Sequence, residues 1–260
     1  MEYWPLFSNV DMLRMARIIT KYVRFLDPAV IDAVAKDNLL QAAQWSTNLM
    51  ERGIDPRLYL WEGSSCCFPG IRRYFGAEEK AFCGKEPVPG VLFQDALELD
   101  FNEYPKKIWE YVQGDVPRGY TLMHILGHVE INNQVRAELD INQYLRGKDI
   151  YGLFTSPANT VYVPNTFVAI INANPRLRGL LITKQQELYS SVCALVPPMV
   201  RILPHSETGG WKFKSFEWAP CSGRNATSAG IQDFLQYRNA MMDKKAMILM
   251  EALTNQQDLG

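Results

Sequence analysis

The chain has 260 residues, of which 47% are hydrophobic and 21% charged, and its formal net charge is −1. This composition is that of a globular protein with a sizeable core, and it excludes a protein that binds nucleic acid through overall basicity, so only a local basic surface could do so. No apolar run reaches the roughly 18 residues of a membrane span, and the N-terminus lacks the basic and apolar regions of a signal peptide. The five cysteines contain no C-x-x-C pair, so neither a zinc ribbon nor a disulfide framework is indicated. We therefore expect a cytoplasmic protein with reduced thiols and no membrane contact.

The first part of the chain is predicted to be helical. Apolar residues recur at helical spacing from Asp11 to Leu26, and Ser8 or Asn9 is the expected N-cap. A second helix is predicted to begin at Pro28. We assign residues 1–57 to a helical N-terminal region, which packs against the rest of the chain and is the candidate for contacts in a homodimer.

Residues 58–118 are predicted to be an irregular connecting region, because glycine and proline interrupt its periodic patterns. Residues 106–112 are expected to be one of its short regular elements. Two patches of basic and aromatic residues are candidates for contacts with DNA phosphates, and a solvated surface is the alternative interpretation. Their basic residues are Arg72, Arg73, Lys106 and Lys107.

Two strands and two helices are predicted farther along the chain. The first strand follows Gly119, and the second covers residues 160–163, which are β-branched or aromatic. A helix is expected after Pro164, with Asn165 or Thr166 as its cap. Another helix is expected from about residue 177 to about residue 195.

The C-terminal part, residues 201–260, is predicted to contain a tryptophan-rich strand over 211–220 and a last helix from about 231 to 253. Lys212 and Lys214 alternate with aromatic residues, so a strand would place both lysines on one face. This face is a candidate for DNA contact, and a half-buried strand with a polar outer side explains the pattern as well. Arg176 and Arg178, at a predicted helix start, have the same two interpretations, phosphate contact or solvation.

The strongest chemical signal comes from histidine and asparagine. His124 and His128 stand four residues apart, and the chain's third histidine is His205. His124 is followed by isoleucine, leucine and glycine at the end of the first predicted strand. Asn159 opens the second predicted strand, which runs into Pro164-Asn165.

These two segments resemble the core of the HNH (ββα-metal) endonuclease family, over about residues 119–167. In that family a histidine ends the first strand, an asparagine opens the second, and a helix follows with a metal ligand. The resemblance implies an α+β fold, with a helical N-terminal region, a ββα-metal core within residues 119–200, and additional strands and helices. It also implies hydrolysis of DNA phosphodiester bonds, in restriction or phage defence.

The same resemblance implies the roles of individual residues. His124 activates water as a general base, since histidine exchanges protons near neutral pH. Asn159 fixes the loop that orients His124, and His128 and Asn165 hold Mg²⁺ or Mn²⁺, which stabilises the leaving oxygen. The sequence departs from the family at Met123, where an acidic residue or histidine usually binds the metal, and in the helix, which lacks the usual histidine.

Three alternatives remain open. In a helix, His124 and His128 would share one face and, with His205, would bind Zn²⁺. Against this, Ile125 replaces the glutamate of a zincin, and Gly127 within the helix would cost about 1 kcal/mol. The second alternative is a non-catalytic DNA-binding protein with a degenerate nuclease core, which Met123 favours. The third is a pair of hydrogen-bonded, partly buried histidines without a chemical role.

Overall fold

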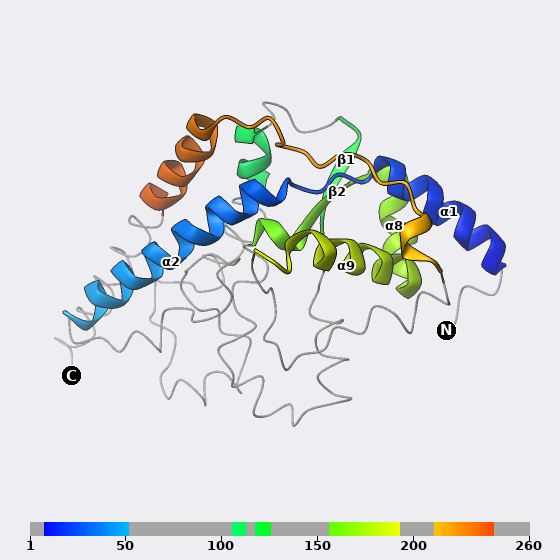
Figure 1. Ribbon diagram of the computed structural model, residues 1–260, viewed down its shortest axis with the longest axis horizontal. Helices are drawn as coiled ribbons and strands as arrows, with labels where there is room; N and C mark the ends of the chain where they lie inside the picture. Colours follow the sequence, from blue (N-terminus) through cyan, green and yellow to red (C-terminus); the bar gives the residue numbers. More distant parts are fainter. Residues whose placement is uncertain (1–7, 52–105, 113–117, 126–155, 193–210, 242–260) are drawn as a thin grey trace, which may run out of the picture.

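The computed structural model describes residues 8–51, 106–112, 118–125, 156–192 and 211–241 (Figure 1). These residues are mainly helical and contain one two-stranded antiparallel sheet, which agrees with the expected α+β class. None of the helices in these ranges combines the length and the apolar composition that a membrane span requires.

Two helices open the described part of the chain. Helix α1 covers Asn9–Tyr22, and the Ser8 hydroxyl caps it by accepting the Asp11 N–H at 3.2 Å, so Ser8 is the N-cap. Helix α2 covers Pro28–Met50 and begins at the predicted proline. The prediction that the first helix continues to Leu26 is wrong, because α1 ends at Tyr22.

The residues between α1 and α2 are extended because their backbone groups pair with distant segments. Arg24 N–H donates to the Tyr162 carbonyl at 2.9 Å, and the Arg24 carbonyl accepts the Tyr162 N–H at 3.0 Å. Leu26 forms a parallel bridge with Ser222 on the opposite side. The apolar spacing of Val23 and Leu26 that suggested a helix therefore reflects burial beside the sheet, where both residues are in the core.

The sheet is a pair of short strands, as predicted. Strand β1 covers Tyr120–His124 and strand β2 covers Thr160–Pro164. They are antiparallel, in a register that pairs Tyr120 with Pro164 and His124 with Thr160. A short 3-10 helix, η2 (Pro157–Asn159), leads directly into β2.

Two helices follow β2 without a long connection. Helix α8 covers Asn165–Ala173, and its N-cap position is Pro164, with no side-chain cap, so the expected capping by Asn165 or Thr166 is not observed. Helix α9 covers Pro175–Tyr189, and the Asn174 side chain caps it by accepting two backbone N–H groups. The prediction that this helix continues to about residue 195 is wrong, because α9 ends at Tyr189 and residues 190–192 form a turn.

The predicted strand over residues 211–220 is wrong. This segment contains a 3-10 helix, η3 (Phe213–Ser215), and then runs without regular structure to Ser222. Its aromatic rings pack on the protein instead of forming a ladder: Trp218 lies 6.0 Å from Phe25 and 5.7 Å from Phe213, measured between ring centroids. Residues 228–241 form the predicted C-terminal helix, whose later part lies outside the described residues.

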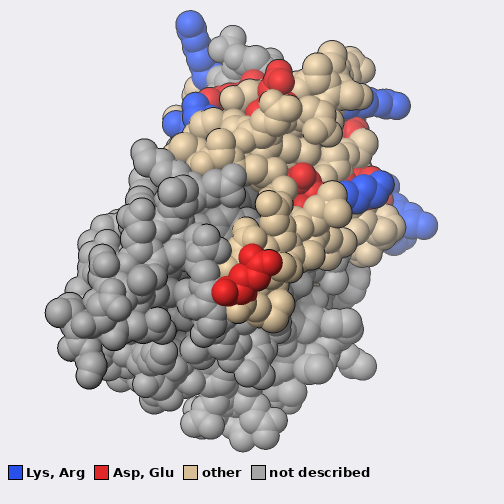
Figure 2. Space-filling model, turned by 90° about the vertical axis from the view of Figure 1, so that its left-hand side faces the viewer, with Lys and Arg blue, Asp and Glu red and all other residues tan. Residues whose placement is uncertain are grey.

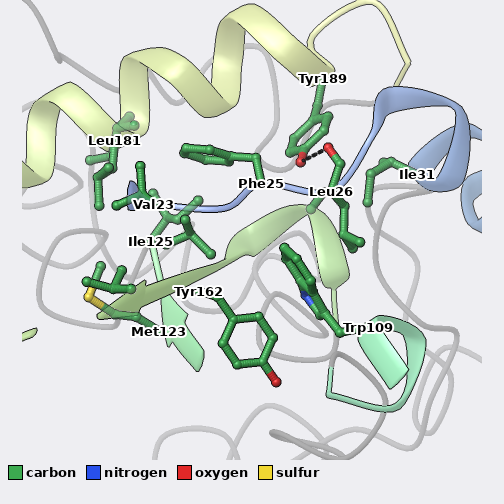
Figure 3. Close-up of a cluster of buried hydrophobic side chains, with 14 of the residues drawn as sticks. Val23, Phe25, Leu26, Ile31, Trp109, Met123, Ile125, Tyr162, Leu181 and Tyr189 are labelled. Atoms are coloured by element: carbon green, nitrogen blue, oxygen red, sulfur yellow. Dashed lines mark hydrogen bonds between the residues drawn. The ribbon is translucent and has the colours of Figure 1, made fainter. Parts of the chain in front are cut away.

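One hydrophobic core connects these elements, and it contains buried residues from all four of the predicted regions. Figure 3 shows its centre, where Val23, Phe25 and Leu26 lie between α9 and the sheet. The Tyr189 hydroxyl donates a hydrogen bond of 2.8 Å to the Leu26 carbonyl. Burial raises the pKa of Tyr189 well above its ordinary value, because the anion would lose its hydration.

Candidate functional site

His124 and Asn159 lie at the same end of the hairpin. His124 is the last residue of β1 and is half-buried, whereas Asn159 ends η2 and is fully buried. The backbone N–H of Ile125 donates to the Asn159 carbonyl at 2.9 Å. The structure therefore brings together, on neighbouring antiparallel segments, the two residues that the sequence identified as base and loop anchor.

The register also fixes the face on which His124 lies. The hydrogen bonds joining Ile125 to Asn159 and Asn165 to Gly119 identify His124–Thr160 as a non-hydrogen-bonded pair, in which the side chains are closest. Because side chains alternate along a strand, His124 shares its face with Thr160 and Tyr162. Trp109, from the helical residues 106–112, packs on this face, with its ring centroid 4.7 Å from that of Tyr162.

Tyr162 is buried on this face. Only 2% of its surface is exposed. Burial, followed by the nearby Glu110 carboxylate, raises its pKa to about 12, since both effects disfavour the phenolate. Tyr162 is therefore held as the neutral phenol on the same face as His124.

Asn165 lies far from His124. Its side-chain oxygen accepts a 2.6 Å hydrogen bond from the Thr121 hydroxyl, and Thr121 is on the opposite face of β1 from His124. Three strand residues, or roughly 10 Å, separate Thr121 from His124 along β1. One cation bound directly by both Asn165 and His124 would need ligands about 4 Å apart or closer, given metal–ligand distances near 2.1 Å. The structure does not bring these two residues together.

The described donors alone do not make a cation site. Met123 is 6% exposed and belongs to the hydrophobic core, and its thioether is too soft for Mg²⁺. Within the described ranges, no cluster of three or more histidine, cysteine or acidic residues is placed to hold a metal ion. His128 and His205 lie outside the described residues, as do Arg72 and Arg73.

The remaining predicted DNA contacts come from three segments, the helical residues 106–112, α9 and the segment around η3. Lys107 forms an ion pair of 2.6 Å with Glu110, Arg176 donates to Asn9, and Arg178 donates to Asn172 at 2.5 Å. The exposed basic residues of this set are Lys106, Lys212 and Lys214. On the face drawn in Figure 2, the coloured part carries separate basic and acidic side chains around a largely uncharged surface.

Thr160 is the residue of this site that the sequence did not indicate. It is fully buried and pairs with His124, but its place depends on strand register, which the sequence of two separated strands does not specify. The β-branched character of residues 160–163 indicated a strand, but it did not indicate which strand would pair with it.

The chain matches no protein-family model, and no curated protein or solved structure is significantly similar to it.

Proposed function

We propose that the protein is a metal-dependent endonuclease that hydrolyses DNA phosphodiester bonds, with a ββα-type core in which His124 is the general base. One observation carries the proposal: the backbone N–H of Ile125, which follows His124 at the end of β1, donates to the carbonyl of Asn159, which immediately precedes β2. The order β1–β2–α8 supports it, since the strands of such a core are antiparallel and a helix follows directly.

In this proposal each residue has a limited task. His124 takes a proton from the attacking water, which histidine can do near neutral pH. Asn159 holds the backbone beyond His124, and its burial restricts the orientations that the base can adopt. A divalent cation, Mg²⁺ or Mn²⁺, would stabilise charge on the phosphate. Its ligands have to include groups outside the described residues, among which His128 is the candidate.

The test is cleavage of supercoiled plasmid by the purified full chain, with Mg²⁺, Mn²⁺, Zn²⁺ or EDTA. We expect nicked and linear DNA with Mg²⁺ or Mn²⁺ and none with EDTA. His124→Ala should abolish cleavage while leaving the melting temperature and DNA affinity near wild type, because the side chain is half-buried at a strand end.

A matched control is Thr121→Ala, on the same strand but on the opposite face and away from His124. It should retain cleavage within a few-fold. Wild-type cleavage by His124→Ala would contradict the assignment of the base, and intact plasmid with every cation would contradict the endonuclease proposal itself.

A second candidate function is non-catalytic DNA binding, and the burial of Met123 favours it. The position that usually supplies a metal ligand beside the base instead contributes to the core. A gel-shift experiment separates the two candidates: a DNA-binding protein shifts DNA with or without a cation and leaves it uncut. The helix that the zinc alternative assumed is not observed at His124, which ends strand β1. Tight Zn²⁺ binding that is lost in His205→Ala would still point to a zinc site, with a geometry other than two histidines on one helix face.

A further inference from the structure

A closed, buried turn lies directly beside His124, and it consists of residues 156–160. The Thr160 hydroxyl donates to the Pro157 carbonyl at 2.7 Å, and the Thr160 backbone N–H donates to the same carbonyl. Asn159 N–H donates to the Ser156 carbonyl at 3.1 Å. Ser156, Asn159 and Thr160 are each 0% exposed, so these bonds are shielded from water and hold the turn in one conformation.

This turn contacts the His124 segment at two points. The carbonyl of Asn159 accepts the N–H of Ile125, the residue that follows His124. Thr160 itself is the register partner of His124 on the same face, where paired Cβ atoms lie about 4.5–5.5 Å apart. A rotation of the turn would therefore move both the Asn159 carbonyl and the surface against which the imidazole lies.

We infer that Thr160 is a positioning residue for the proposed cleavage: its hydroxyl fixes the turn whose Asn159 carbonyl holds the backbone immediately after His124. The catalytic consequence rests on the proposed function, whereas the effect on His124 does not. Thr160 acts through the backbone, because it is fully buried and cannot reach a DNA phosphate.

Three substitutions separate the hydroxyl from the shape of the side chain. Thr160→Val keeps the shape and removes the donor, and Thr160→Ser keeps the donor and removes a methyl group. Thr183→Val is the matched control, because the Thr183 hydroxyl donates to the Gly179 carbonyl at 2.9 Å within α9, a bond that does not involve the turn. If Thr160→Val does not fold, Thr160→Ala removes the donor with a smaller side chain, which does not press a methyl group against the Pro157 carbonyl.

The first measurement is steady-state plasmid cleavage with Mg²⁺. A displacement of the base by about 1 Å lowers kcat on the order of a hundredfold, so Thr160→Val should lose about this factor in kcat with KM for DNA unchanged. The kcat of Thr160→Ser should be within a few-fold of the wild-type kcat, and the kcat of Thr183→Val should equal the wild-type value. If the role of Thr160 is merely structural, the cleavage rate should instead follow the fraction of folded protein. Thr160→Ser should then regain activity only as far as it regains stability.

The second measurement does not need activity. In protein with ¹³C-labelled histidine, the His124 imidazole signal, assigned with His124→Ala, should shift in Thr160→Val and stay in place in Thr160→Ser and Thr183→Val. A shifted signal together with no cleavage by any variant, wild type included, supports the positioning role and overturns the nuclease proposal. An unshifted signal and wild-type kcat in Thr160→Val overturn the inference and leave the nuclease proposal standing.

Discussion

Thr121 and Asn165 join the end of the hairpin that lies farthest from His124, through a hydrogen bond of 2.6 Å between the Thr121 hydroxyl and the Asn165 side-chain oxygen. The backbone N–H of Asn165 also donates to the Gly119 carbonyl at 2.9 Å. Gly119 has a φ of +75°, a conformation that glycine adopts without strain. Asn165 therefore secures the start of β1 to the start of α8.

This geometry predicts that Asn165→Ala is mild. Loss of one exposed side-chain hydrogen bond should lower the free energy of unfolding by about 1 kcal/mol, and cleavage should stay within a few-fold of wild type. Thr121→Ala should have the same effect on the melting temperature, and the double variant should add little, since both changes remove one bond. His128→Ala is the comparison in the cleavage assay, because His128 is the candidate metal ligand in the proposed function. Loss of cleavage in Asn165→Ala with an unchanged fold would return Asn165 to the metal site.

Asn159→Ala should lower the cleavage rate more than the affinity for DNA. Alanine keeps the main-chain carbonyl that accepts the Ile125 N–H, but it empties a fully buried position in the turn. The turn should therefore shift and misplace the base, at a cost on the order of a hundredfold in kcat. Fluorescence anisotropy with labelled DNA and EDTA measures affinity separately from cleavage. Equal losses in affinity and rate would point to a general folding role for Asn159.

We expect the buried ion pair between Arg238 and Asp37 to contribute more to the free energy of unfolding than any other polar contact between the C-terminal helix and α2. The Arg238 side chain is 1% exposed and that of Asp37 19%, and Arg238 also donates to Asn38 at 2.6 Å. Asp37→Ala removes a carboxylate that pairs with a buried guanidinium, so it should lower the free energy of unfolding by about 3–5 kcal/mol. Chemical denaturation measures this difference.

The matched control for this pair is Lys36→Ala, one residue away. Lys36 pairs with Asp32 at 2.6 Å on the surface, with side chains 72% and 41% exposed, so its loss should cost at most about 0.5 kcal/mol. Equal effects of Asp37→Ala and Lys36→Ala would show that the Arg238 pair contributes no more than an exposed one.

Stability should fall in alkaline solution, and Tyr162 should account for part of the loss. Burial raises the pKa of Tyr162 from its ordinary 10.0 to about 12. The unfolded chain therefore loses this proton at lower pH than the folded protein, so the stabilisation is complete below pH 10.0 and is lost as pH rises toward about 12. Denaturation across this range should show a shallower decline in Tyr162→Phe than in wild type.

Local patterns in the sequence were sufficient where a segment's own residues decide its structure. The starts of α1, α2 and α9 follow from Ser8, Pro28 and Pro175, because caps and N-terminal prolines act within one turn. Strands β1 and β2 follow from β-branched and aromatic residues. His124 and Asn159 could be paired in advance only through the family resemblance, which supplied an order of strands that periodicity does not contain.

The structural features that the sequence did not predict depend on pairing between segments that are distant in the chain. Val23 and Leu26 continue the helical spacing of α1, yet the backbone of Arg24 finds its partners on β2. The alternation over 211–220 is that of a strand, but the rings of Phe216 and Trp218 pack against other aromatic residues. Within the described part of the chain, no strand pairs with this segment. The positions of Asn165 and Thr160 relative to His124 likewise depend on register, which is a property of two strands together.

The extended segment around Arg24 has a consequence for how the chain folds during its synthesis on the ribosome. Its partners, Tyr162 on one side and Ser222 on the other, are translated long after it leaves the exit tunnel. Until then Phe25 and Leu26, which are buried in the folded protein, lack the segments that pair with their backbone, and contacts between such distant positions form slowly. Nascent chains that stop before Ser222 should therefore be held by chaperones or aggregate, and the finished protein should tolerate loss of its C-terminal part poorly.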